Sequence, residues 1–331
     1  MKDLHDYSLL AHNTFGIAAR CSRFLEYATE DEALTVATLL QDPYIIIGGG
    51  SNLLLTRDFE GTVVHAAIKG IEALGDGRVR CGSGEQWDDV VEWCVNNHLY
   101  GAENLSLIPG DVGASAVQNI GAYGVEVKDL IDSIEAVEIE TGQLRTFTNS
   151  ECGYGYRDSR FKHEWKNRFL ITHVTYRLSA DYRPNIQYGN ISRELQRLGI
   201  SQPDAAQLRE VIIGIRRAKL PDPLVTGNAG SFFMNPVVSR QKYEELAAAY
   251  PQMPHYFIDA DHEKIPAGWM IEQCGWKGRS LGRAGVHDRQ ALVLVNLGGA
   301  TGAEIVALCE AVRADVRQRF GIDIHPEVNI V

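Results

Sequence analysis

Several features that define other classes of protein are missing from this sequence of 331 residues. Its six cysteines form no C-x-x-C pair, so the spacing typical of zinc sites and disulfide frameworks is absent. No stretch reaches the roughly 18 uninterrupted apolar residues that span a bilayer, and the first residues contain no apolar core of a signal peptide. We therefore expect reduced cysteines, no metal site and a cytoplasmic protein without a membrane partner.

Basic residues are also scarce relative to acidic ones. The chain has 32 lysines and arginines against 43 aspartates and glutamates, which gives a formal net charge of −11. This balance argues against broad electrostatic attraction to nucleic acid or anionic lipid, so we expect no nucleic-acid partner. An anionic ligand would need a local cluster of cations.

Apolar residues recur at both helical and strand spacing along the chain. Residues 25–28 form an apolar run, residues 31–40 have helical spacing, and residues 44–47 predict a second strand, which together give a β-α-β opening. Further strands are predicted at residues 53–55, 63–64 and 79–81, and an amphipathic helix from Trp87 to about Asn97.

Turn and cap residues mark three more elements. Thr141-Gly142 separates residues 133–140 from residues 144–148 and predicts an antiparallel hairpin with a two-residue turn, because glycine accepts a positive φ. Residues 208–220 predict a helix that ends before Pro221. Thr301 and Glu304 form the sequence pattern of a capping box at the start of another helix.

A glycine-rich turn, Gly-Gly-Gly-Ser-Asn at residues 48–52, follows the second predicted strand. Residues without a Cβ let backbone N–H groups approach an anion, so this turn has the properties of a phosphate cradle. A plain tight turn explains the same glycines equally well. The common nucleotide loops do not fit, because Leu53 stands where G-x-G-x-x-G requires glycine and the sequence contains no Gly-Lys pair.

The second glycine-rich stretch, residues 108–124, places four glycines among small and amide side chains. Such a segment cannot form a well-packed strand or a stable helix throughout, and it is too apolar for an exposed linker. We expect it to lie against a large flat ligand. The alternative is a buried irregular crossing of the chain.

Six stretches in this order resemble the family of UDP-N-acetylenolpyruvoylglucosamine reductases. The first two are the glycine turn and the second glycine-rich stretch. The other four are YRDS with FK at residues 156–162, KLPDP at 219–223, GNAGSFF with NP at 227–236, and HPEV at 325–328. The resemblance therefore covers nearly the whole chain.

The resemblance implies an α+β architecture: a vanillyl-alcohol-oxidase-type FAD-binding fold of two subdomains plus a third, substrate-binding α+β domain. The expected boundaries are residues 1–66 for the first subdomain, to which a strand at 321–331 returns, residues 67–213 for the second, and residues 214–320 for the third domain. Tyr188 in its Gln-Tyr-Gly-Asn context suggests the subclass with a tyrosine loop that closes over the substrate.

The activity implied is the NADPH-dependent conversion of UDP-N-acetylenolpyruvoylglucosamine to UDP-N-acetylmuramate in peptidoglycan synthesis, with FAD as cofactor. We expect a monomer whose partners are this sugar nucleotide and NADPH. The implied FAD-binding residues are Gly48, Gly49, Gly50, Ser51, Asn52, Leu53, Pro109, Gly110, Gly113, Ala114, Ser115, Asn119 and Gly121. The implied substrate-binding residues are Tyr188, Arg216, Lys219, Asn235 and Gln290.

The reaction also indicates three catalytic residues. Hydride addition to the terminal carbon of an enolpyruvyl ether leaves negative charge on the next carbon, where Arg157 is the natural cation. That carbanion is a strong base, so a hydroxyl held within hydrogen-bond reach can protonate it, and Ser231 fits this role. In the family, Glu327 stands near the same carbon, where it supports the enolate if protonated or orients the proton donor. Taken alone, Ser231 is ordinary turn chemistry.

Four positions depart from the family pattern: Asp111, Ala116, Met234 and Asn329. None of them removes a proposed catalytic group, but they leave the affinity for FAD and NADPH open. Three alternatives remain: an FAD-dependent oxidase or dehydrogenase of a small alcohol, a non-catalytic UDP-sugar binder, and a serine hydrolase. The last rests on the G-x-S-x-G match at residues 278–282, whose flanks lack the required strand and helix.

Overall fold

The computed structural model describes residues 1–331 and divides the chain into two compact units. Unit 1 comprises residues 1–7, 21–49 and 59–218, and unit 2 comprises residues 8–20, 50–58 and 219–331. Both units combine helices with sheets, which confirms the α+β class. The finer division into three domains stays a prediction. None of the helices combines the length and the apolarity that crossing a membrane requires.

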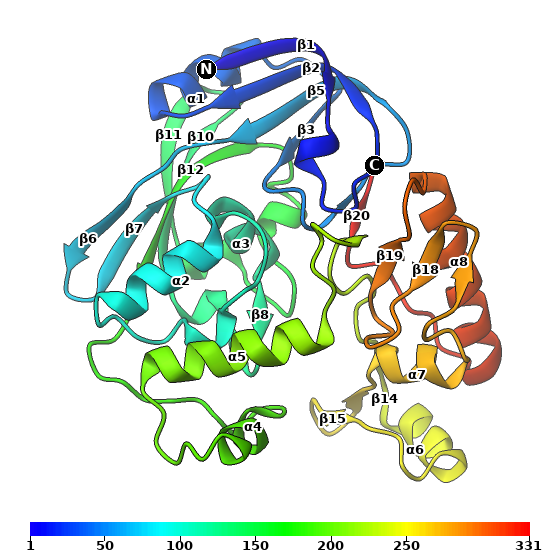
Figure 1. The fold of residues 1–331 in the computed structure, drawn as a ribbon. Coiled ribbons are helices and arrows are strands. Elements are labelled where there is room, and N and C mark those ends of the chain that lie inside the picture. Colours follow the sequence, from blue (N-terminus) through cyan, green and yellow to red (C-terminus); the bar gives the residue numbers. More distant parts are fainter. The chain divides into compact units, whose positions relative to one another are not determined.

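The first sheet of unit 1 has the strand order β1-β2-β5-β3, in which β5 pairs in parallel with both β2 and β3 (Figure 1). The predicted β-α-β opening is confirmed, although β5 lies between its two strands. Thr29 begins the connecting helix, since its side chain accepts a hydrogen bond from the backbone N–H of Glu32. The elements are β1 (Lys2–Ser8), β2 (Arg20–Tyr27), α1 (Glu30–Leu39), β3 (Tyr44–Ile47) and β5 (Phe59–Ala66).

The second sheet of unit 1 is antiparallel, with the order β11-β10-β12-β7-β6. Two helices, α2 and α3, pack on it and share its apolar core (Figure 1). The elements are β6 (Ile71–Gly75), β7 (Arg78–Gly82), α2 (Trp87–Asn96), α3 (Val112–Gln118), β10 (Ile131–Glu138), β11 (Gln143–Thr148) and β12 (Phe169–Arg177). A separate antiparallel pair consists of β8 (Gly121–Ala122) and β9 (Val125–Glu126).

Helix α1 joins the two sheets of unit 1. Its buried face, which includes Val36, packs with Leu25 and Val64 of the first sheet and with Val137 and Leu170 of the second. Burial of such aliphatic side chains contributes about 1.5–3 kcal/mol each relative to exposure. The amphipathic helix predicted from Trp87 is confirmed as α2. Its regularly spaced apolar side chains are buried against the second sheet.

The predicted hairpin between β10 and β11 is confirmed as an antiparallel pair, but its two-residue turn is wrong. Glu138 is the last paired residue and Gln143 the first, so residues 139–142 form the loop. The backbone N–H of Ile139 donates to the carbonyl of Arg168 at 2.9 Å, and that of Gly142 donates to the carbonyl of Glu138 at 2.8 Å. Contact with the chain before β12 therefore lengthens a turn that sequence alone assigned to Thr141-Gly142.

Two helices complete unit 1, α4 (Ile191–Arg197) and α5 (Ala205–Lys219). They bury a separate apolar cluster that includes Ile191, Leu208 and Ile212. The helix predicted at residues 208–220 is confirmed as α5.

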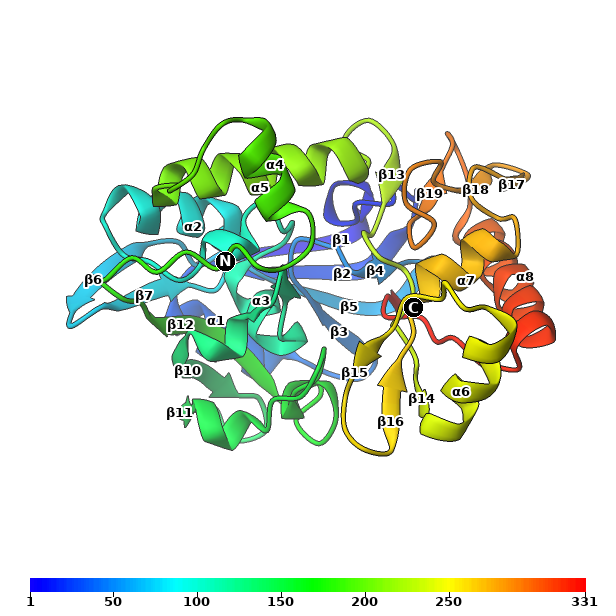
Figure 2. The same ribbon diagram turned by 90° about the horizontal axis from the view of Figure 1, so that it is seen from below.

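Unit 2 contains a four-stranded sheet of order β13-β19-β18-β17, a three-stranded sheet of order β14-β16-β15, and the parallel pair of β4 and β20. Helix α8 packs along the first sheet and against α7 (Figure 2). The predicted capping box of Thr301 and Glu304 is confirmed at its start. The elements are β4 (Leu53–Leu54), β13 (Gly227–Asn228), β14 (Val237–Ser239), α6 (Arg240–Ala249), β15 (Tyr256–Phe257), β16 (His262–Lys264), α7 (Ala267–Gln273), β17 (Ser280–Leu281), β18 (Ala284–Val286), β19 (Leu294–Asn296), α8 (Gly302–Phe320) and β20 (Asn329–Ile330).

Candidate functional site

The two glycine-rich stretches meet in unit 1. Gly48 and Gly49 follow β3 directly, and they lie against the start of α3. A Cβ on Gly48 would be 2.9 Å from the Cβ of Ala114, and a Cβ on Gly49 would be 3.0 Å from Oδ1 of Asp111. Both distances are shorter than ordinary contacts, so a side chain at either position would require its neighbour to shift. The rest of the turn, residues 50–52, belongs to unit 2.

Part of the second glycine-rich stretch is a helix, α3. It ends at Asn119, which has a left-handed backbone with φ of 45°. The Asn119 amide donates to Oε2 of Glu126 at 3.0 Å and to the carbonyl of Gly155 at 2.6 Å. The hydroxyl of Ser115 donates to the carbonyl of Val112 at 2.7 Å. These two predicted cofactor residues are buried, so their side chains fix the shape of the segment.

Arg157 lies against the end of the same segment. Its guanidinium donates from Nη2 to the carbonyl of Gly121 at 2.6 Å and from Nη1 to the carbonyl of Asn119 at 3.3 Å. Its own backbone has a φ of 55°, an uncommon conformation for a residue with a long side chain. Lys162 donates to the Arg157 carbonyl at 2.6 Å and holds this conformation. The predicted catalytic cation is therefore fixed on the glycine-rich segment.

Arg216 of α5 lies close enough to Arg157 for the two guanidinium groups to repel each other. Burial is the main cause that lowers the pKa of Arg216, and the charge of Arg157 adds to it, whereas Tyr123 acts in the opposite direction. The group stays charged at neutral pH, because the ordinary pKa of an arginine lies far above 7. Its Nε is buried without a hydrogen-bond partner. A desolvated cation with an unused donor favours an anionic ligand such as a phosphate.

Tyr188 and Gly189 lie against the segment of Tyr123, the residue that interacts with Arg216. The Tyr188 ring lies over the backbone of Gly124, where a Cβ would be 3.3 Å from ring atom Cδ2, and the neighbouring Gly189 packs on Tyr123 in the same way. The Tyr188 side chain remains 43% exposed. Unit 1 thus brings together Arg157, Tyr188 and Arg216, which the sequence placed in three separate motifs.

Unit 2 brings Ser231 and Glu327 together through backbone pairing. The N–H of Phe232 donates to the carbonyl of Leu292 at 2.8 Å, and the N–H of Glu327 donates to the carbonyl of Phe232 at 2.8 Å. Phe232 is fully buried, whereas the adjacent Ser231 is exposed. The predicted proton donor and the predicted carboxylate therefore lie on neighbouring segments that backbone hydrogen bonds join.

Three other predicted residues belong to unit 2. Asn235 accepts a hydrogen bond from the first N–H of α7 at 2.9 Å, and Gln290 accepts one from the N–H of Leu292 at 3.3 Å. Both interactions use the amide oxygen, so each NH₂ group can donate to a ligand. Lys219 is exposed at the end of α5.

Residues 12–14, which the sequence analysis did not single out, contact two of the predicted site segments. Thr14 donates from its hydroxyl to the carbonyl of Asn228 at 2.6 Å and from its N–H to the carbonyl of Gly50 at 3.1 Å. A Cβ on Gly50 would be 2.0 Å from the carbonyl oxygen of His12. Residues 12–14 therefore support both the glycine turn and the chain that leads to Ser231. The only signal in the sequence was the Asn-Thr-Phe-Gly run at residues 13–16.

Glu327 is further connected to the glycine turn within unit 2. The Asn52 side chain donates to the Glu327 carbonyl at 3.3 Å, and the N–H of Asn329 donates to the Asn52 carbonyl at 3.1 Å. Asn52 was predicted as a cofactor residue, and its contacts show that it also fixes the backbone of a predicted catalytic residue.

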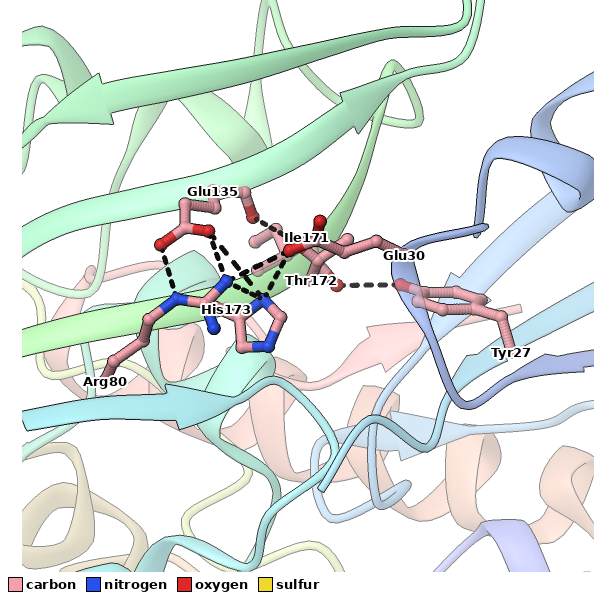
Figure 3. Close-up of polar contacts among 7 residues, drawn as sticks. All are labelled: Tyr27, Glu30, Arg80, Glu135, Ile171, Thr172 and His173. Carbon is pink, nitrogen blue, oxygen red and sulfur yellow. Dashed lines mark hydrogen bonds and ion pairs between the residues drawn. The ribbon is translucent and has the colours of Figure 1, made fainter. Parts of the chain in front are cut away.

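One group of side chains in unit 1 has the composition of a metal site. Glu30, Glu135 and His173 lie within ligand distance of one another. Arg80 occupies the space between them: Nη2 is 3.0 Å from Glu30, 2.6 Å from Glu135 and 2.9 Å from Nδ1 of His173 (Figure 3). The group is therefore an ion-pair network that connects α1 to the second sheet. The nearby hydroxyl of Tyr27 makes a second connection, to the carbonyl of Ile171.

The hydrolase alternative fails on geometry. Ser280 lies in the short strand β17, which pairs with β18 as a hairpin. A nucleophile elbow instead requires a sharp turn between a strand and a helix.

Comparison with known families defines the class of protein. Residues 26–148 match the family model described as FAD binding domain, and residues 222–331 match the model described as UDP-N-acetylenolpyruvoylglucosamine reductase, C-terminal domain. The chain is therefore an FAD-binding protein, with the vanillyl-alcohol-oxidase-type α+β fold expected from the resemblance.

Curated relatives narrow the class. The chain is 58% identical to the UDP-N-acetylenolpyruvoylglucosamine reductase of Bacteroides fragilis, over 98% of this chain and 99% of that protein. It is 49% identical to the reductase of Burkholderia orbicola, over 98% of this chain and 95% of that protein. The crystal structure of the Thermus caldophilus reductase shares the fold with a TM-score of 0.69 at 21% identity, over 99% of this chain and 98% of that chain. The chain belongs to the family of UDP-N-acetylenolpyruvoylglucosamine reductases.

Proposed function

We propose that this protein reduces the enolpyruvyl double bond of UDP-N-acetylenolpyruvoylglucosamine to give UDP-N-acetylmuramate, with NADPH as reductant, during peptidoglycan synthesis. The observation that carries the proposal is the pairing of the Ser231 and Glu327 segments. This pairing joins the two segments by backbone hydrogen bonds, next to the buried aromatic residues Phe232 and Phe233. Membership of the reductase family supports the choice of substrate. We also propose that the protein acts in the cytoplasm, as a monomer, without a membrane or nucleic-acid partner.

The residues of the glycine-rich stretches fit an FAD cofactor. The absence of a Cβ at Gly48 and Gly49, where the chain is closely packed, lets backbone N–H groups reach a diphosphate. When bound, FAD supplies the hydride for the substrate carbon. The residues proposed to hold it are Gly48, Gly49, Gly50, Ser51, Asn52, Leu53, Pro109, Gly110, Gly113, Ala114, Ser115, Asn119 and Gly121. For Ser115 and Asn119 the contact would come from the backbone, because their side chains bond within the protein.

The proposed catalytic roles follow from the chemistry of each side chain. The Ser231 hydroxyl gives its proton to the carbon next to the carboxylate, and Glu327 orients that hydroxyl or supports the enolate. Arg157 stabilises the negative charge that develops on the enolate, because its guanidinium is fixed before the reaction begins. Fixed donors cost no reorganisation at the moment of reaction.

The remaining polar residues are proposed to bind the substrate. Arg216 and Lys219 would neutralise the diphosphate, which a protein with net charge −11 can attract only through a local cluster of cations. Asn235 and Gln290 would donate from their free NH₂ groups. Tyr188, exposed beside the cationic group, would close over the sugar nucleotide as in the subclass with a tyrosine loop.

An anaerobic spectroscopic cycle tests the proposal. The purified protein should show flavin absorbance, lose it on addition of NADPH, and regain it only when the enolpyruvyl sugar nucleotide is added. Recovery of the flavin absorbance with the oxidation product of a small alcohol, or with oxygen alone, would favour an oxidase. A protein that shows no flavin absorbance even after incubation with FAD would contradict the proposed chemistry as a whole.

A further inference from the structure

A carboxylate stands where the proposed function requires a diphosphate to approach. Asp111 precedes α3 and is only 3% exposed. A Cβ on Gly48 would be 3.5 Å from Oδ2 of Asp111, and one on Gly49 would be 3.0 Å from Oδ1. The carboxylate therefore lies directly against the glycine turn. Left unbalanced, its negative charge would oppose an anionic ligand on that turn.

His65, near the end of β5, supplies the balancing group. Its Nε2 is 3.6 Å from Oδ2 of Asp111, and its Nδ1 is 3.1 Å from Oε2 of Glu26. The other carboxylate oxygen of Asp111 accepts a hydrogen bond from the amide of Gln86. A neutral imidazole can donate from only one of its nitrogens, whereas the protonated ring donates from both. One carboxylate lies at each nitrogen, and this arrangement favours the protonated ring.

The surroundings of His65 favour the same state. Burial opposes the charge, but the hydrogen bonds and charges of Asp111 and Glu26 outweigh it and raise the pKa of His65. The ring is flanked by Phe24, whose centroid lies 6.3 Å away with the ring planes 24° apart. The charged groups that face the ring are Asp111 and Glu26, and Lys2 of β1 pairs with Glu26 at 2.7 Å.

We propose that Asp111 and a protonated His65 form a charge-balanced support for the glycine turn, so that the protonation of His65 controls the affinity for the FAD diphosphate. In this role both are positioning residues, because they act through the turn. The inference rests on the proposed placement of FAD on the glycine turn. When His65 loses its proton, the charge of Asp111 has one counterion fewer and repels the diphosphate. By linkage, binding of FAD must then draw a proton onto His65.

FAD affinity of the full-length apoprotein, measured by flavin fluorescence between pH 6 and pH 9, tests this directly. For the wild type we expect the dissociation constant to rise by about tenfold across this range, since the loss of one nearby charge changes a binding constant by that order. Asp111→Asn should move the pH dependence to lower pH, because His65 then keeps only Glu26 as a carboxylate partner. At high pH this variant should bind FAD more tightly than the wild type, because the amide carries no charge and can still accept from Gln86. His65→Gln should bind FAD weakly at every pH, and adding Asp111→Asn to it should restore affinity.

A second readout is the number of protons taken up when FAD binds, obtained by calorimetry in two buffers of different ionisation enthalpy. The wild type should take up a fraction of a proton near the pKa of His65, and in Asp111→Asn the pH of maximum proton uptake should be lower. His173→Asn is the matched control, since this histidine lies in the ion-pair network of the second sheet, and it should keep the wild-type pH profile. Circular dichroism of each apoprotein checks that the variant is folded.

The outcomes separate this inference from the proposed function. A wild-type affinity that is flat with pH, or a pH dependence that is identical in Asp111→Asn and the wild type, would overturn the role of the pair while FAD binding stands. If the effects of the two single substitutions simply add, the pair is not coupled, and the inference fails again. A wild type that binds no FAD at any pH would instead contradict the proposed function.

Discussion

Replacement of Ser231 by alanine should damage one half of the catalytic cycle and spare the other. The Ser231 side chain is exposed, while its neighbours Phe232 and Phe233 are buried and hold the backbone. Removing one exposed hydroxyl should change the free energy of unfolding by no more than about 0.5 kcal/mol. The frame that presents position 231 should therefore persist, so that a change in rate reports on chemistry.

The expected magnitude follows from the role of the hydroxyl. A positioned general acid contributes about 10²- to 10⁴-fold to a proton-transfer step, or about 2.7–5.4 kcal/mol of transition-state stabilisation. Flavin reduction by NADPH requires no proton from Ser231, so its rate should stay within about twofold of the wild type. Reoxidation by the enolpyruvyl substrate should slow by the full factor. Anaerobic stopped-flow absorbance measures the two half-reactions separately.

Two control variants sharpen this experiment. Ser231→Cys keeps a proton donor at the position and should recover part of the lost rate. Ser280→Ala removes an exposed serine from β17 and should leave both half-reactions unchanged. Equal slowing of reduction and reoxidation in Ser231→Ala would show that the side chain has a structural or binding role, and the assignment of Ser231 as proton donor would have to be given up.

Three further predictions concern other parts of the molecule. Lys219→Ala should raise the Michaelis constant for the sugar nucleotide several-fold with little change in kcat, and an unchanged constant in steady-state assays would contradict a phosphate contact. Thr301→Ala should destabilise unit 2 by about 1 kcal/mol through loss of the capping box of α8, and thermal melting of Thr301→Ser, which keeps the hydroxyl, should match the wild type. Burial, together with the charge of Arg80, lowers the pKa of His173 in the folded state. The contribution of His173 to the free energy of unfolding is therefore fully present above the unfolded pKa of about 6.5, and it is lost as the pH falls through the lower folded pKa. Melting temperatures of His173→Asn should therefore depend less on pH below 6.5 than those of the wild type.

Local elements were predictable because their signals lie within one short window of sequence. The helix α2 follows from apolar residues at helical spacing, and the start of α8 from a threonine and a glutamate three positions apart. The strand β3 coincides with the predicted residues 44–47. The turn between β10 and β11 was mispredicted because its length depends on Arg168, which is distant in sequence.

Candidate site residues were predictable as motifs, but their spatial relations were not. Ser231 and Glu327 come from separate motifs, and their proximity arises from backbone hydrogen bonds that no pattern in either motif specifies. The same holds for Thr14, whose contacts with Gly50 and Asn228 join three distant segments of unit 2. Local periodicity cannot reveal such pairings, because strand register and chain crossings are set by the packing of the whole unit.

Asp111, which departs from the family pattern, can be interpreted only together with its partner residues. Taken alone, an acidic residue in a stretch that approaches a diphosphate counts against cofactor binding. In the structure its carboxylate is paired with Gln86 and faces His65, and His65 in turn is held by Glu26. A buried charge is tolerated only where a partner is supplied, so an aspartate at this position requires a partner such as the histidine on β5. If that is correct, His65→Gln should cost more FAD affinity in the presence of Asp111 than in its absence, and the double-mutant cycle measures that difference directly.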